Sequence, residues 1–335
     1  MYQPGFAVYI TLGHMTRYLD TLPQPWTRAQ LEAALFKSHS DVRLSIAETP
    51  GGKLWRALQD LDDSVWIFQA STTELLDEIS LFGKRSKNPT FWHEAHGSEA
   101  ETHTRAVKRK VFNCTSALMA LVDHARHFQR ATPVSGYDER LKADFSTPGL
   151  HDFLKSLRNY NVHWRIAQTN WVIEHDLKVH SRETRFRVSK AELLMWDGWT
   201  ASAKDFIARA SDTVDVYDVF STYRKHVQSF YAWHHGSVLD QFHAVLRPYL
   251  DYKRIYEGLL KKYNWNLVLS HVPKTANPFQ YLRQYLPQHQ VERLLIYDHR
   301  SDEQVDALVH MLDMEDFCDP PLREKLLALF RQSPA

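Results

Sequence analysis

Apolar residues recur with a helical period along most of the chain. The clearest case is residues 105–129, where they return every three or four positions and so share one face of an α-helix. The residues of this face are Val107, Val111, Phe112, Thr115, Leu118, Met119, Val122 and Ala125. Glycine is scarce, with 11 in 335 residues, which disfavours a sandwich or barrel with many tight turns. The pattern therefore predicts a mainly α fold.

Further helices are expected on both sides of this one. They cover residues 27–37, 71–82, 190–199, 201–210, 214–246, 251–263 and 302–312. Another is expected to begin with Thr147 as its cap and Pro148 as its first residue, because proline suits the first turn of a helix. Its apolar face would carry Leu150, Phe153, Leu154, Leu157, Asn161 and Trp164. A turn is expected at Pro50-Gly51-Gly52.

Two segments depart from the helical period. Residues 171–179 and 184–188 are rich in β-branched and aromatic residues that partly alternate, and a polar stretch at 180–183 separates them. They predict a β-hairpin. A short apolar run at 291–297 is also expected to be a strand. Together the patterns predict a helical bundle with a β-hairpin insertion and additional helical N- and C-terminal regions.

Polar stretches at 93–104 and 131–146 suggest how the chain is divided. We expect an N-terminal helical region at 1–95 and a central helical domain at 96–255, with the hairpin at about 171–188. A mixed helical region is expected at 256–335. There is no run of eighteen apolar residues and no basic segment followed by an apolar one near the start, so we expect a cytoplasmic protein with no membrane partner. The two cysteines, Cys114 and Cys318, are expected to be buried thiols.

Charge is unevenly distributed although the net charge is only +1. Residues 101–190 hold 16 Lys and Arg against 9 Asp and Glu, whereas residues 1–100 hold 9 against 12. A locally basic segment is what a phosphate backbone would contact, but ordinary variation among solvated helix faces accounts for it equally well.

The basic segment contains Arg158 and His163 within the expected helix, with Asn159 directly after the arginine. Spacing alone is a weak signal, because chance gives about four Arg-to-His pairs at this separation and the chain has three. The other two, Arg283 to His289 and Arg293 to His299, run through a proline or a strand-like segment. Only the first pair is expected on a stable helical surface.

The segment Leu157-Arg158-Asn159-Tyr160-Asn161-Val162-His163 follows a long helix whose apolar stripe leads through Leu118 and Val122 into the polar run Asp123-His124-Ala125-Arg126. In this it resembles the HEPN superfamily of helical domains, whose motif is Arg, usually a polar residue, a few further residues, then His. The resemblance covers about residues 100–250. It implies either a metal-independent endoribonuclease of toxin-antitoxin or antiviral defence systems, which leaves a 2′,3′-cyclic phosphate, or a non-catalytic binder of RNA, nucleotide or protein.

The residue types suit cleavage of RNA without a metal ion or cofactor. An imidazole can move protons, so His163 can serve as general base or acid, while the guanidinium of Arg158 offers forked donors to phosphate oxygens. Asn159 could orient His163 or bind a phosphate oxygen, and Asp123 and Arg126 are candidates to support the site from the preceding helix. One helix cannot enclose a substrate, so either a second helix or a second copy of this one across a dimer axis has to complete the pocket. By analogy with the family we expect a homodimer, with RNA and an antitoxin or regulatory protein as partners.

Two other chemistries have weaker support. Histidines gather at His93 and His96, at His124 and His127, and at His226, His234 and His235, but none of these groups has a firm metal-ligand spacing, so no metal is expected. Tryptophans could stack on bases, although their positions continue the apolar stripes and favour the core. These tryptophans are Trp164, Trp171, Trp196, Trp199 and Trp233.

Overall fold

The computed structural model describes residues 16–93, 97–164, 166–176, 181–272 and 276–332. The chain forms two compact units, one of Leu54–His243 and the other of Met1–Lys53 with Ala244–Ala335. The second unit combines both ends of the chain because the N-terminal helices share a core with a helix near the C-terminus. The division expected from the sequence, at 95/96 and 255/256, follows the chain in order and differs from this grouping.

The unit 54–243 is built on three long helices. In chain order, the elements that begin in or enter this unit are α3 (Pro50–Arg85), η2 (Pro89–Trp92), α4 (Gly97–Ala131), α5 (Tyr137–Asp144), α6 (Leu150–His163), β1 (Thr169–Asp176), β2 (Ser181–Ser189), α7 (Lys190–Leu194), α8 (Ala201–Arg209), β3 (Thr213–Asp215) and α9 (Val216–Gln241). The fold is mainly α with a β-hairpin insertion, as predicted. The expected helix at 105–129 lies within α4.

Helix α3 runs antiparallel to α4 and to α9. Toward the end of α3, Glu78 Oε1 lies 2.5 Å from His103 Nδ1, and Ser64 nearer its start contacts His124. On its other side, Thr73 accepts a hydrogen bond from Arg224, and the rings of Phe68 and Tyr223 lie 5.9 Å apart. Burial raises the pKa of Glu78, but hydrogen bonds from His103 and Lys110 outweigh it and leave that pKa below its ordinary value.

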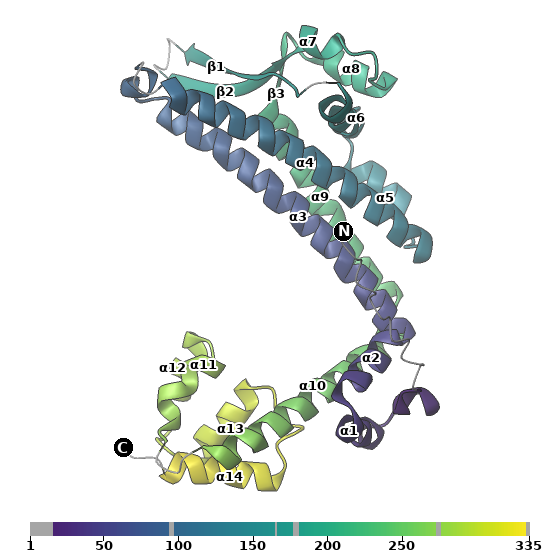
Figure 1. Ribbon diagram of the computed structural model, residues 1–335, viewed down its shortest axis with the longest axis vertical. Coiled ribbons are helices and arrows are strands. Elements are labelled where there is room, and N and C mark those ends of the chain that lie inside the picture. The colour runs from purple at the N-terminus through teal and green to yellow at the C-terminus, as the bar shows by residue number, and fades with distance from the viewer. Residues whose placement is uncertain (1–15, 94–96, 165, 177–180, 273–275, 333–335) are drawn as a thin grey trace, which may run out of the picture. The chain divides into compact units, whose positions relative to one another are not determined.

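The sheet lies at one end of the long helices (Figure 1). Strands β1 and β2 pair antiparallel with Trp171 opposite Phe186, which confirms the predicted hairpin, and β3 adds to β2. The ring of Phe186 is fully buried and lies 5.0 Å from that of Phe82 on α3. Ser86 also hydrogen-bonds Thr184 across this contact at 2.7 Å. Part of the expected turn at 180–183 lies outside the described residues.

The other unit contains shorter helices around one long one. Its elements are η1 (Tyr18–Thr21), α1 (Arg28–Lys37), α2 (His39–Glu48), α10 (His243–His271), η4 (Pro278–Tyr281), α11 (Leu282–Tyr285), α12 (Gln288–Leu294), α13 (Asp302–Met311) and α14 (Pro320–Gln332). The prediction of a strand at 291–297 was wrong. Val291 and Leu294 are buried three positions apart while Ile296 is 82% exposed, so the run forms one helical face rather than an alternating strand.

Other boundaries also differ from those expected. The Pro50-Gly51-Gly52 turn is instead the first turn of α3, where a side chain at Gly51 would collide with the carbonyl oxygen of Val245. The segment 131–146, expected as a linker, contains α5, and the helix expected at 190–199 stops at Leu194. The helix expected at 214–246 divides into β3, α9 and the start of α10, and α10 continues through Pro248.

No helix in the described parts of the chain combines the length and the apolar character needed to cross a membrane.

Candidate functional site

Helix α6 carries the Arg158 motif, and its apolar face holds it against the rest of the unit. Of the expected face, Leu150, Phe153, Leu154, Leu157 and Asn161 are buried, whereas Trp164 is 40% exposed; Tyr160, which was not expected on this face, is fully buried. The helix begins at Leu150 and not at Pro148. Gly149 precedes it with φ of +78°, which is not a helical conformation, so Thr147 does not cap the helix as expected. A Cβ at Gly149 would also collide with the backbone oxygen of Ser202.

The end of α6 is also defined by local contacts. The Trp164 amide donates to the carbonyl oxygen of Tyr160 at 3.1 Å and closes the last turn. Asn161 is buried, and its Oδ1 accepts a hydrogen bond from the Ala167 amide at 3.0 Å. That bond turns the chain back from the helix toward β1 and leaves His163 at the helix end.

Arg158 and Asn159 are in direct contact, whereas His163 stands apart. Nη1 of half-buried Arg158 donates to Oδ1 of Asn159 at 3.2 Å. His163 is exposed and makes no hydrogen bond or ion pair with any residue that the structure describes. On a regular helix, Arg158 and His163 are separated by about 140° around the axis and about 7.5 Å along it, whereas Asn159 and His163 share a face.

Exposed apolar side chains flank His163. Val162 is 43% exposed and Ile166 is 48% exposed. Trp164, 40% exposed, lies edge-on to the buried Tyr160 ring at 4.9 Å. The imidazole therefore lies on a partly apolar surface.

Asp123 and Arg126 lie on α4, at the other end of α6 from His163. The two helices pack antiparallel, since Lys108 early in α4 donates to Gln168, beyond the end of α6, at 2.8 Å. Arg126, later in α4, instead lines a cavity with His151 from the first turn of α6. His151 precedes Arg158 by seven residues, about 10 Å along the helix. Within one chain, Asp123 and Arg126 therefore pair with each other, at 3.7 Å, and not with the motif.

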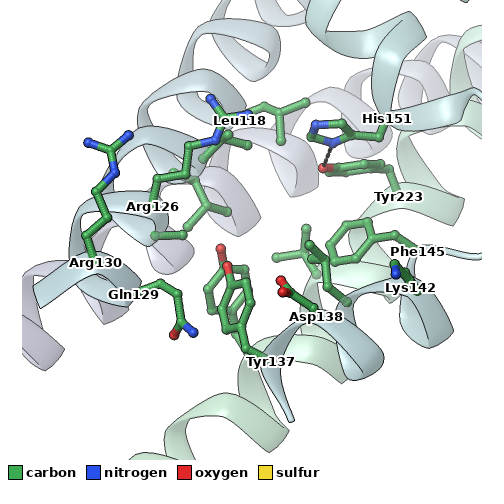
Figure 2. A pocket seen from close by; sticks show the side chains of 16 residues that line it. Leu118, Arg126, Gln129, Arg130, Tyr137, Asp138, Lys142, Phe145, His151 and Tyr223 are labelled. Carbon is green, nitrogen blue, oxygen red and sulfur yellow. Dashed lines mark hydrogen bonds between the residues drawn. The ribbon is translucent and has the colours of Figure 1, made fainter. Parts of the chain in front are cut away.

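The cavity that Arg126 lines was missed by reasoning from the sequence. It lies among α4, α5, α6 and α9 and has a volume of about 530 Å³ (Figure 2). Its lining is Leu118, Leu121, Val122, Ala125, Arg126, Gln129, Arg130, Tyr137, Asp138, Leu141, Lys142, Phe145, His151, Tyr223, Val227 and Tyr231. The residues come from positions more than 100 apart in the chain, so no local motif marks the cavity.

Burial keeps the imidazole and the phenol groups of this cavity uncharged. His151 Nδ1 and the Tyr223 hydroxyl are 2.7 Å apart, with their rings stacked. Burial lowers the pKa of His151 below its ordinary value, which keeps the imidazole neutral at pH 7. Burial also raises the pKa values of Tyr137, Tyr223 and Tyr231, so these phenols stay protonated.

The histidine groups considered as metal ligands do not converge. Across the described residues, no group of three or more His, Cys, Asp and Glu side chains is placed to hold a metal ion. The three histidines of α9 have separate surroundings: His226 Nε2 lies 3.0 Å from the Thr147 hydroxyl, His235 pairs with Asp62 at 3.0 Å, and His234 is buried. Residues 94–96, which include His96, lie outside the described residues.

The tryptophans divide between core and surface. Trp199 is buried, Trp171, Trp196 and Trp233 are half-buried, and Trp164 is exposed.

Both cysteines are free; Cys114 is buried and Cys318 half-buried. Burial raises the pKa of the Cys114 thiol to about 12.

No protein-family model, no curated protein and no solved structure matches the chain.

Proposed function

We propose that the chain is a metal-independent endoribonuclease in which Arg158 and His163 act on a phosphodiester of RNA. The observation that supports this most directly is that neither side chain is paired with a carboxylate of the described residues. Arg158 has a neutral amide as its hydrogen-bond partner, and no carboxylate in the described structure neutralises it. His163 is exposed on the same helix end. An accessible guanidinium and imidazole are the groups that such cleavage needs.

In the proposed reaction the RNA provides its own nucleophile. His163 takes the proton of the 2′-hydroxyl as its oxygen attacks the neighbouring phosphorus, and Arg158 donates to the non-bridging oxygens as negative charge develops. The bond from phosphorus to the 5′-oxygen breaks, and that oxygen takes a proton from a second acid. The products are a 2′,3′-cyclic phosphate and a 5′-hydroxyl. Asn159 orients Arg158 through their hydrogen bond.

A second copy of the chain completes this site. One helix does not enclose a substrate, and the cavity at the other end of α6 includes neither Arg158 nor His163. The exposed Val162 and Ile166 beside His163 offer an apolar surface on which the copy can pack. The His163 of the second copy then serves as the acid that protonates the leaving oxygen.

The biological setting of the proposal rests on the HEPN resemblance alone. We place the protein in the cytoplasm as a toxin or antiviral effector, held inactive by an antitoxin or another regulatory protein. The competing proposal is a non-catalytic module that uses the same basic and aromatic face to hold RNA, a nucleotide or a protein. Exposed Trp164, which follows His163 in the chain, favours the RNA form of that alternative, because base stacking needs an accessible ring.

Cleavage of RNA by the purified protein in the presence of a chelator tests the proposal. The wild type should release products that end in cyclic phosphate. Arg158→Ala and His163→Ala should each slow cleavage by about 100-fold or more, since each removes a group used in the transition state. Asn159→Ala should have a smaller effect, because it removes only the orientation of Arg158.

Arg293→Ala and His299→Ala are the matched controls. Both residues are exposed and lie at similar spacing in the other compact unit, so these variants should cut RNA at the wild-type rate. Cleavage that survives both Arg158→Ala and His163→Ala would contradict the proposal. Tight RNA binding by the wild type, with no cleavage, would favour the non-catalytic module.

A further inference from the structure

We infer that the cavity among α4, α5, α6 and α9 binds a small organic anion, a molecule with an apolar body and one carboxylate or phosphate group. This site is separate from the proposed ribonuclease site. His151 lies in the first turn of α6 and Arg126 lines the cavity with it from α4, whereas Arg158 and His163 lie seven and twelve residues further along α6. The inference therefore does not depend on whether the protein cleaves RNA.

The polar groups of the cavity are mostly hydrogen-bond donors. Arg126 and Arg130 extend from α4 on one side, and Lys142 with Asp138 lies on α5 across from them (Figure 2). Three cations thus share the lining with one carboxylate. Arg130 and Lys142 make no ion pair with any described residue, and the partner of Arg126, Asp123, is a further residue of α4 at 3.7 Å. The lining therefore carries a net positive charge that an anion would neutralise.

Neutral donors add to these cations. His151 Nδ1 and the buried Tyr223 hydroxyl share one hydrogen bond at 2.7 Å. The neutral imidazole and the phenol hold two protons between them, so in either tautomer one N–H or O–H of the pair is left to donate to a ligand. The hydroxyls of Tyr137 and Tyr231 belong to the lining, and within the described structure neither is engaged in a hydrogen bond. Gln129, by contrast, is used internally, because its side chain bonds the Val134 backbone amide at 3.0 Å. A ligand rich in acceptors fits this donor set.

The rest of the lining is apolar. Leu118, Leu121, Val122, Leu141 and Val227 supply aliphatic surface, and Phe145 supplies an aromatic ring. A volume of about 530 Å³ lies in the range typical of small-molecule sites, and it is too small for a folded partner or an RNA strand. The cavity thus suits a compact molecule whose apolar body is enclosed while its charged group meets Arg126 and Arg130.

Calorimetric titration of the full chain with two pairs of probes tests the inference. Indole-3-acetate is compared with indole-3-ethanol, and phenyl phosphate with phenol, so that each anion has a neutral counterpart with the same ring. At least one anion should bind at least about tenfold more tightly than its counterpart, because charge-assisted hydrogen bonds are stronger than neutral ones. Binding of indole-3-acetate alone identifies a carboxylate site, and binding of phenyl phosphate alone a phosphate site.

Variants locate the binding. The double variant Arg126→Gln with Arg130→Gln should weaken anion binding about tenfold or more, whereas Arg109→Gln, on an exposed part of α4 outside the cavity, should not. Ala125→Phe should fill the cavity and remove binding. The inference is overturned if no anion binds, if each anion binds no better than its neutral counterpart, or if the double variant binds as tightly as wild type. Its substituted side chains are exposed, so this variant tests the site even if Ala125→Phe does not fold.

Discussion

His234 on α9 illustrates how burial alters a single residue. Its side chain is 2% exposed and is surrounded by rings, with Phe128 at 5.3 Å and Tyr137 at 5.8 Å. Burial, together with the nearby His235, lowers the pKa of His234 from 6.5 to about 4. The folded protein therefore keeps this imidazole neutral at a pH where the unfolded chain protonates it.

The free energy of unfolding should consequently depend on pH through His234. Above pH 6.5 neither state binds a proton here, and between 6.5 and about 4 only the unfolded chain does, so acidification through this range destabilises the fold. The full effect is about 3 kcal/mol. In His234→Phe, urea unfolding at pH 7 and pH 4.5 should show a smaller loss of stability than in wild type. The same loss in both proteins would disprove this, and exposed His127→Phe is the control.

The sequence around His234 does not show how deeply this residue is buried. A stripe that includes Phe230, Val227 and Val238 places one face of α9 inward, and His234 lies on that face. The sequence indicates the face but not how completely α4 and α5 cover it. The same is true of His151, whose pKa is lowered by burial and whose ring stacks on that of Tyr223, 72 residues away.

At the scale of elements, two glycines should respond in opposite ways to the same substitution. Gly149 starts α6 with φ of +78° and leaves no room for a Cβ against Ser202. Gly149→Ala should therefore destabilise the protein by about 1–3 kcal/mol. Gly236 lies inside α9, and a methyl group there would meet no atom within 4 Å, so Gly236→Ala should stabilise by about 0.5–1 kcal/mol.

Thermal unfolding of the two variants checks this pair of predictions. Opposite shifts in Tm are expected, and a rise in Tm for Gly149→Ala would contradict the strain at the start of α6. Because α6 carries both Arg158 and His163, Gly149→Ala should also reduce RNA cleavage.

Element type followed well from the sequence where periodicity was long or turn chemistry distinct. The apolar stripe of α4 and the alternation in β1 and β2 are local signals, and both predict the element that forms. Of the 36-residue α3, the sequence predicts only 71–82, since its first turns contain Pro50, Gly51 and Gly52. These residues suggest a turn on local grounds, yet they form the first turn of α3, where Gly51 lies too close to Val245 for a side chain.

At the scale of the whole molecule, the proposed dimer makes RNA cleavage depend on the exposed apolar surface near His163. Ile166→Asp places a charge on the apolar surface beside His163, which should separate the copies and reduce RNA cleavage while Arg158 and His163 are unchanged. Ile67→Asp on α3 is the control, because Ile67 is 49% exposed and Ile166 is 48% exposed. The mass measured by light scattering and the rate of RNA cleavage should both fall for Ile166→Asp and should both stay at the wild-type values for Ile67→Asp. A monomeric wild type that cleaves RNA would contradict the dimer.

The amino-acid sequence by itself determined the mainly α class, the hairpin and the helix that presents Arg158, Asn159 and His163, because each depends on residues within a few turns of one another. Only the tertiary structure decided that both ends of the chain share a unit, that Arg126 on α4 lies by the start of α6 and not by His163, and that a donor-lined cavity forms around His151. Those features arise where segments distant in sequence pack together, and their burial and charge exist only after that packing.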